Sequence, residues 1–128
     1  MKRKLNINID HVATLRQARQ GTYPDPIDTI EIIKKAKANG IVMHLREDRR
    51  HIQLNDLRRF KKKYKFHFNL EMAPTIDMIN IANKIKPDVI TLVPEKRMEL
   101  TTEGGLNLKT NFDNLEKLVK KISKDIRI

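Results

Sequence analysis

The sequence contains no cysteine. This absence excludes disulfide bonds, thiolate catalysis and zinc sites built from cysteine. The apolar runs are only a few residues long, far too short for a membrane-spanning helix, and the amino terminus lacks the apolar core of a signal peptide. From these absences we expect a soluble intracellular protein.

Length and composition indicate one folded domain. A chain of 128 residues has room for little more, and its 39% of hydrophobic residues are enough to build a core. Wholesale disorder is therefore not expected.

The chain is strongly basic, with 27 lysines and arginines against 16 acidic residues and a formal charge of +11. One explanation is an anionic partner, either nucleic acid or a phosphorylated small molecule. The other is compositional drift, because 17 lysines, 16 isoleucines and 10 asparagines are typical of an AT-rich genome. Charge runs usually form solvated faces, so the charge alone does not decide between them.

Short apolar segments alternate with longer helical ones. We expect strands near residues 5–10, 41–46, 66–72 and 89–93. Helices are predicted to begin at Asp25-Pro26, at a cap on Asn55 and at a cap on Thr75, and a last helix follows a glycine-bearing loop at 101–105. Residues 126–128 resemble the beginning of a fifth strand.

Serial strand–helix units favour a parallel sheet with right-handed crossovers. An open doubly wound sheet would need a glycine-rich turn after the first strand, and residues 10–13 (DHVA) do not provide one. A complete barrel needs about 200 residues or more. We therefore predict an α/β fold of the (β/α) TIM-barrel type, in which residues 1–128 form one partial domain with the first four β/α units, a half barrel.

Polar residues gather at the carboxyl ends of the predicted strands, where β/α folds place their sites. Burying such groups without partners costs about 1–3 kcal/mol each, so their accumulation favours a functional site over structural roles. His44 and Glu71 are candidates for acid/base chemistry. Planar guanidinium groups that could hold phosphate oxygens occur at the following positions: Arg16, Arg19, Arg46, Arg49 and Arg50.

The other titratable residues have competing explanations. His11 could hold a functional tautomer or merely end a strand, and Arg49-Arg50 could be plain surface residues. His67 begins its strand and is interpreted as structural. A metal could be held by Asp10, His11, His44 and Glu71, but no HExxH-type spacing supports this, and we expect no metal.

Several sequence blocks together resemble the pyridoxine 5′-phosphate synthase family. The blocks follow the family order and are residues 8–16 (NIDHVATLR), 18–19 (AR), 23–26 (YPDP), 44–52 (HLREDRRHI), 69–72 (NLEM), 92–97 (LVPEKR) and 101–106 (TTEGGL). They span nearly the whole chain. One local rearrangement lies at residues 19–22.

The resemblance implies a cytoplasmic β/α barrel that assembles as a homo-octamer and needs no metal or organic cofactor. It implies the condensation of 1-deoxy-D-xylulose 5-phosphate with 3-amino-2-oxopropyl phosphate to give pyridoxine 5′-phosphate, phosphate and water in vitamin B6 biosynthesis. By matched position, His44 and Glu71 would be the acid/base residues. Asn8 and Arg19 would hold the aminoketone phosphate. The deoxyxylulose phosphate would contact Asp10, His11, Arg46, His51 and Thr101.

Family members are about twice as long, and their later strands supply a further acid/base histidine, a supporting glutamate and phosphate-binding loops. Two hypotheses follow: an active synthase, or an inactive remnant or half-barrel subunit that needs a separately encoded second half. A nucleic-acid binder is disfavoured, because the six aromatic residues form no recognition motif and the basic residues are spread along the chain. The partners we expect are phosphorylated small molecules and other copies of the chain, with no nucleic acid and no membrane.

Overall fold

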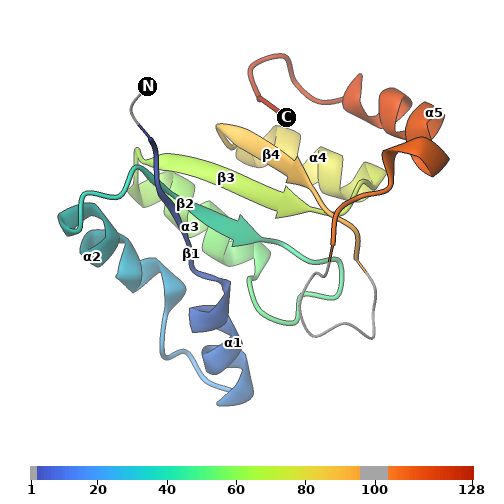
Figure 1. Ribbon diagram of the computed structural model, residues 1–128. Helices are drawn as coiled ribbons and strands as arrows, with labels where there is room; N and C mark the ends of the chain where they lie inside the picture. Colours follow the sequence, from blue (N-terminus) through green and yellow to red (C-terminus); the bar gives the residue numbers. More distant parts are fainter. Residues whose placement is uncertain (1–2, 96–103) are drawn as a thin grey trace.

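A computed structural model describes residues 3–95 and 104–128. In this part of the chain, strands alternate with helices, as Figure 1 shows. The elements in chain order are β1 (Asn6–Asn8), α1 (Asp10–Ala18), the 3-10 helix η1 (Pro26–Thr29), α2 (Ile30–Lys35), β2 (Gly40–His44), α3 (Leu54–Lys63), β3 (His67–Met72), α4 (Ile76–Ile85), β4 (Val89–Leu92) and α5 (Leu108–Val119).

The four strands form one parallel sheet in the order β1-β2-β3-β4. Consecutive strands pair directly, so Asn8 lies opposite Val42, and His44 lies opposite Glu71. This arrangement confirms the predicted α/β architecture, and four parallel strands alternating with helices are consistent with half of a TIM barrel.

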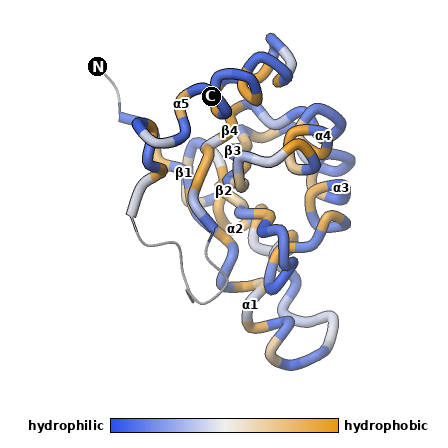
Figure 2. The backbone as a smooth tube through the Cα atoms, turned by 90° about the vertical axis from the view of Figure 1, so that its right-hand side faces the viewer, coloured by the Kyte–Doolittle hydropathy of each residue, from blue (hydrophilic) through white to orange (hydrophobic). Residues whose placement is uncertain are grey.

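The two faces of the sheet differ in chemistry. In β3, Phe68, Leu70 and Met72 are fully buried on the face that packs against α3 and α4 (Figures 1 and 2). The intervening His67, Asn69 and Glu71 are only half-buried on the opposite face. The apolar core therefore lies between the sheet and its helices, and the polar alternate positions share the other face.

Gly40 fixes how closely β1 and β3 approach β2. A Cβ atom at this position would lie 2.5 Å from the His67 carbonyl oxygen and 2.8 Å from Asn6 Oδ1. Both atoms belong to neighbouring strands, so a side chain would force the sheet apart. The glycine at the start of β2 is therefore a packing requirement of the sheet.

Several predicted boundaries differ from the structure. The first strand is shorter than residues 5–10, because Asp10 already begins α1, a helix that the sequence interpretation missed. The cap of α3 is Gln53 rather than Asn55, and Gln53 and Asp56 form a reciprocal capping box. Thr75 caps α4 as expected, since its hydroxyl accepts a hydrogen bond from Met78 N.

The carboxyl-terminal residues return to the sheet. Arg127 forms a parallel bridge with Val89, and Ile90 N donates to the Arg127 carbonyl at 2.7 Å. Leu118, Ile122 and Ile126 join the hydrophobic core. The strand-like character expected at residues 126–128 is thus present as a single bridge beside β4. None of the helices in the described residues has the length and apolarity needed to span a membrane.

Candidate active site

Asp10 links the ends of the first two strands. Its Oδ1 accepts a hydrogen bond from His44 N at 2.8 Å, and its Oδ2 accepts from Asn8 Nδ2 at 2.9 Å. The Asp10 N–H in turn donates to Asn8 Oδ1 at 2.8 Å. Asp10 is buried at the start of α1, so these contacts fix where β1 ends and where β2 presents His44.

His44 and Glu71 are register partners on adjacent parallel strands, so their side chains lie on the same face of the sheet. Burial raises the pKa of Glu71, and the charge of Asp10 raises it further, while His44 acts in the opposite direction. A carboxyl group whose pKa is raised can carry a proton closer to neutral pH. The pair therefore has the placement and the electrostatics of acid/base groups.

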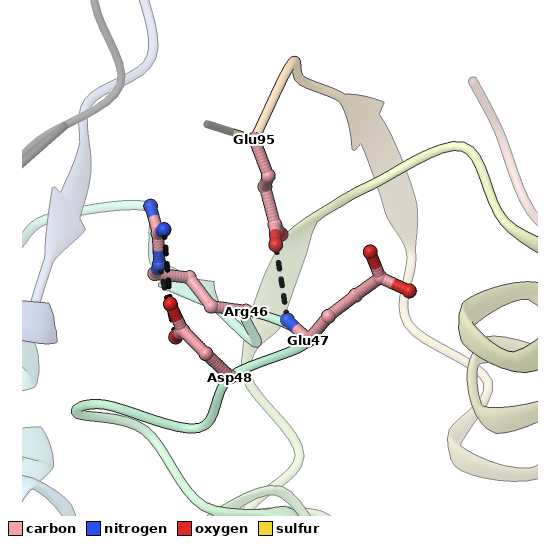
Figure 3. A pocket seen from close by; sticks show the side chains of 4 residues that line it. All are labelled: Arg46, Glu47, Asp48 and Glu95. Carbon is pink, nitrogen blue, oxygen red and sulfur yellow. Dashed lines mark hydrogen bonds and ion pairs between the residues drawn. The ribbon is translucent and has the colours of Figure 1, made fainter. Parts of the chain in front are cut away.

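Glu95 reaches the same histidine from the end of β4. His44 Nε2 and Glu95 Oε1 are 2.9 Å apart, and both side chains are less than one tenth exposed. The second carboxylate oxygen of Glu95 accepts a hydrogen bond from Glu47 N at 3.0 Å, as Figure 3 shows. Asp10, Glu71 and Glu95 therefore bring three strand ends to His44, and Glu95 contacts its ring.

A cavity of about 300 Å³ opens beside this contact, lined by Arg46, Glu47, Asp48 and Glu95. Figure 3 shows that the carboxylate of Glu47 points away from Arg46 and Asp48. Arg46 is buried, and its guanidinium group donates to both carboxylate oxygens of Asp48 at 3.1 Å. Arg50 also pairs with Asp48, at 2.7 Å.

The two arginines hold Asp48 in its charged form. Burial alone would raise the pKa of Asp48, but hydrogen bonds from Arg46 and Arg50 outweigh it and place that pKa well below its usual value. Arg50 therefore belongs to an ion-pair network around Asp48, in which both side chains are about one third exposed. In this structure Asp48 therefore occupies the Nε and Nη2 donors of Arg46 that could otherwise bind phosphate oxygens.

His51 has a defined protonation pattern. Its Nδ1 accepts a hydrogen bond from Ile52 N at 2.8 Å, and because a backbone N–H can only donate, Nδ1 has no proton. Burial lowers the pKa of His51, with repulsion from His44 and Arg46 acting in the same direction and the Asp10 and Asp48 charges opposing. The ring is thus neutral and carries its proton on Nε2.

Arg16 has a structural role rather than the phosphate contact considered from the sequence. Its guanidinium group forms a buried two-pronged pair with Asp56, at 2.8 Å and 2.9 Å, and also donates to the His51 carbonyl at 3.1 Å. Asp56 additionally accepts from Gln53 N at 2.8 Å. Arg16 therefore ties α1 to the loop that carries His51 and to the start of α3.

The remaining predicted site residues lie at varying distances from this cluster. Asn8 contacts Asp10, whereas His11 is exposed on α1, with its Nδ1 3.5 Å from Thr14 Oγ1. Arg19 is exposed at the carboxyl end of α1, about 13 Å along the helix axis from Asp10 by helix geometry. Thr101 lies outside the described residues.

His67 and Arg49 both contact other parts of the chain. His67 is half-buried at the start of β3, with Nδ1 3.8 Å from Asp88, at the opposite end of the strand from Glu71. Arg49 donates to the Arg46 carbonyl oxygen and lies against the Met78 sulfur, so its guanidinium group is already engaged within the fold.

Asp10, His44 and His51 place one potential metal-ligating atom each within 4.8 Å of one another. Their hydrogen bonds do not fit a three-residue metal site. His51 carries its proton on Nε2, because Nδ1 already accepts from Ile52 N, and a protonated nitrogen cannot bind a metal. His44 Nε2 faces the Glu95 carboxylate. The donor set instead fits proton exchange and hydrogen bonding to a polar ligand.

Sequence reasoning counted Glu95 among the polar residues at the strand ends without giving it a role, and it missed Asp56. Glu95 follows the fourth strand closely, which is where a β/α fold places site residues, and this position was its only signal in the sequence. The signal for Asp56 was its position three residues after Gln53, where an acidic side chain completes a capping box.

Comparisons with known proteins identify the family of the chain. The family profile described as "Pyridoxal phosphate biosynthesis protein PdxJ" matches residues 5–128. A protein of Geotalea uraniireducens named pyridoxine 5′-phosphate synthase is 55% identical over 119 residues, which are 93% of this chain and 50% of the relative. Relatives with the same name are 53% identical in Microcystis aeruginosa (118 residues; 92% and 49%) and 56% identical in Geobacter sulfurreducens (112 residues; 88% and 47%).

The chain spans about half the length of the curated relatives that it matches. The family match runs from residue 5, just before the first strand, to residue 128. The matched region includes every strand end that contributes to the cluster around His44. On this match, the chain belongs to the PdxJ family.

Proposed function

We propose that the chain provides the acid/base centre of a pyridoxine 5′-phosphate synthase. The reaction condenses 1-deoxy-D-xylulose 5-phosphate with 3-amino-2-oxopropyl phosphate and releases pyridoxine 5′-phosphate, phosphate and water. The observation that carries the proposal is the pairing of His44 with Glu71 at neighbouring strand ends, in a chain whose relatives bear the name of this enzyme.

The chemistry requires repeated proton transfers. Joining an amine to a ketone, expelling water and phosphate, and closing an aromatic ring each move a proton to or from a reacting atom. Glu71 supports this role because burial and the nearby Asp10 charge favour its protonated form. His44 supports it because a ring nitrogen can both accept and return a proton.

The phosphorylated substrates require cationic and neutral donors. In this proposal Arg46 and the Nε2–H of His51 contact the deoxyxylulose phosphate, together with Asp10, His11 and Thr101. Asn8 and Arg19 hold the aminoketone phosphate. The buried position of Arg46 and the defined tautomer of His51 support these roles. Holding both substrates at one sheet edge would supply the proximity that a two-substrate condensation needs.

The expected assembly belongs to the same proposal. Family resemblance implies a cytoplasmic homo-octamer, whose mass would be that of eight 15.0 kDa chains and can be measured by light scattering. The relatives are about twice as long, so the proposal has a second form in which another polypeptide supplies the later strands. The two forms make different predictions for the isolated chain.

The test is a ring-closing assay of the purified chain with both substrates, in which pyridoxine 5′-phosphate and released phosphate are measured together. We expect His44→Asn and Glu71→Gln each to reduce product formation by about 100-fold. The exposed Lys124→Gln, near the carboxyl terminus, serves as the matched control and leaves the rate unchanged.

The outcomes separate the two forms of the proposal from an inactive chain. Product that is lost in His44→Asn supports an active site that works with this half alone. Product only after addition of a second-half polypeptide supports the half-barrel subunit. No product from a co-purified, cooperatively unfolding complex of both halves contradicts the proposal and identifies the chain as an inactive remnant.

A further inference from the structure

Glu95 is held between a side chain and the backbone. Its Oε1 is 2.9 Å from His44 Nε2, and its Oε2 accepts a hydrogen bond from Glu47 N at 3.0 Å. The Glu95 and His44 side chains are 8% and 6% exposed, so solvent has little access to their contact. Figure 3 shows Glu95 extending from the end of β4 toward the backbone of Glu47.

These contacts determine where the proton of the imidazole lies. An ionised carboxylate can only accept hydrogen bonds, so the nitrogen facing it must donate. Burial alone would raise the pKa of Glu95, but hydrogen bonds from His44 and from Glu47 N, with the nearby charges, outweigh burial and lower it. Glu95 is therefore ionised, and His44 Nε2 carries the proton of the hydrogen bond between the two side chains.

We propose that Glu95 is a positioning residue for His44: it holds the ring in the Nε2–H tautomer, so that Nδ1 is the atom that accepts and returns protons in the reaction. This inference rests on the proposed function for its catalytic meaning. The structural part of the inference is that Glu95 selects the Nε2–H tautomer of His44. That part does not depend on whether the chain is active.

The histidine is fixed from both ends. Its backbone N–H donates to Asp10 Oδ1 at 2.8 Å, and its ring is anchored through Nε2 to Glu95. The His51 ring packs edge-on against it, with centroids 5.9 Å apart and an interplanar angle of 63°. A ring held in this way presents Nδ1 in one orientation, which is what a group that serves in several successive proton transfers requires.

The substitution Glu95→Gln isolates this role because it keeps the size of the side chain and changes its hydrogen-bonding capacity. A carboxylate has two accepting oxygens, whereas an amide has one oxygen and a donating nitrogen. If the amide oxygen continues to accept from Glu47 N, the amide nitrogen faces His44 Nε2 and donates to it. The imidazole proton must then move to Nδ1, which blocks the proposed base.

The experiment is nitrogen NMR of the full chain labelled with ¹⁵N-histidine, at a pH where the His44 ring is neutral. The chain has four histidines, and the His44 signals are identified by their loss in His44→Asn. We expect wild type to show a protonated Nε2 and an unprotonated Nδ1, and Glu95→Gln to reverse this pattern. Glu95→Asp, which keeps a carboxylate, should restore Nε2–H in part.

Glu47→Gln is the matched control, because it exchanges a neighbouring carboxylate in the same cavity while the Glu47 backbone N–H remains. Its His44 signals should equal those of wild type. The proposal is overturned if Glu95→Gln leaves the tautomer unchanged, or if wild type itself carries the proton on Nδ1. The second result does not depend on Glu95→Gln, so it decides the matter even if that variant does not fold.

The kinetic arm separates this inference from the proposed function. In an active preparation, Glu95→Gln should lower kcat about 100-fold with little change in KM, because the substrate contacts remain while the base is blocked. An unchanged kcat overturns the role of Nδ1. A wild-type chain that shows the Nε2–H pattern but no product refutes the proposed function and leaves the tautomer assignment standing.

Discussion

The carboxylate of Asp10 accepts a hydrogen bond from the backbone N–H of His44 across 34 residues of sequence. Asp10 stands at the start of α1, and His44 is the last residue of β2. One buried side chain thus connects the end of the first strand to the histidine of the candidate site. A change at Asp10 should therefore affect stability and the position of the site together.

Asp10→Asn should lower the free energy of unfolding by about 1–3 kcal/mol. The amide has a single accepting oxygen, so the contact to either His44 N or Asn8 Nδ2 is lost. Urea unfolding followed by circular dichroism measures the change. Asp125→Asn, at an exposed position, is the control and should stay within about 0.5 kcal/mol of wild type. Equal stability of both variants would contradict the bridging role.

Removing one partner of the Arg16–Asp56 pair should cost about 3–5 kcal/mol, because the other charge stays buried without compensation. Asp56→Ala is the informative variant, with stability measured by urea unfolding. The comparison is Arg59→Ala, whose pair with Asp25 is nearly half exposed on the arginine side and should contribute less than about 1 kcal/mol. Similar losses of unfolding free energy in both variants would show that the buried pair contributes no more to stability than the exposed pair.

Gly40→Ala should destabilise the sheet by about 1–3 kcal/mol or prevent its formation, because the new methyl group would meet the His67 carbonyl and Asn6 Oδ1. Thermal unfolding gives the size of the effect. Gly105→Ala has no atom within 4 Å of its added Cβ and should unfold like wild type. A Gly40→Ala chain as stable as the Gly105→Ala chain would refute the close approach of the strands.

Glu71→Gln should stabilise the chain at neutral pH. Because the pKa of Glu71 is raised in the folded state, the native chain binds this proton more strongly than the unfolded chain does. The corresponding stability is present below the ordinary value of 4.5 and is lost as pH rises through the native pKa. Melting temperatures from pH 4 to 8 should therefore diverge in favour of the variant as pH increases. Convergence toward high pH would reverse the sign and contradict the burial of this carboxyl group.

The sequence was a good guide to those features that depend on local periodicity. In β3, which the sequence predicts near residues 66–72, the apolar Phe68, Leu70 and Met72 alternate with polar residues and form the buried face. The polar alternates led directly to His44 and Glu71 as residues at neighbouring strand ends. Helix α1 was not predicted, because Asp10 and His11 were interpreted as the end of a strand. The Ala, Leu, Arg and Gln residues that follow them favour a helix.

Features that depend on long-range partners could not be obtained in this way. The contact between His44 and Glu95 joins residues 51 positions apart, and its existence depends on the lengths of two intervening β/α units. The partner of Arg16 also depends on the fold. From the sequence, Arg16 was a candidate phosphate ligand, but in the structure it pairs with Asp56, 40 residues further along the chain. Residue type indicates what a side chain can bind, but the fold decides which partner it meets.

Each strand of the sheet after β1 hydrogen-bonds to the strand that precedes it in the chain. During synthesis on a ribosome, every strand therefore emerges with its neighbour already made, and the sheet can grow in one direction without waiting for distant sequence. His44 is synthesised at the end of the second strand, whereas Glu95 is synthesised only after the fourth strand. The sheet around His44 thus forms before the hydrogen bond to Glu95, and that contact is made only when the last of these four strands docks.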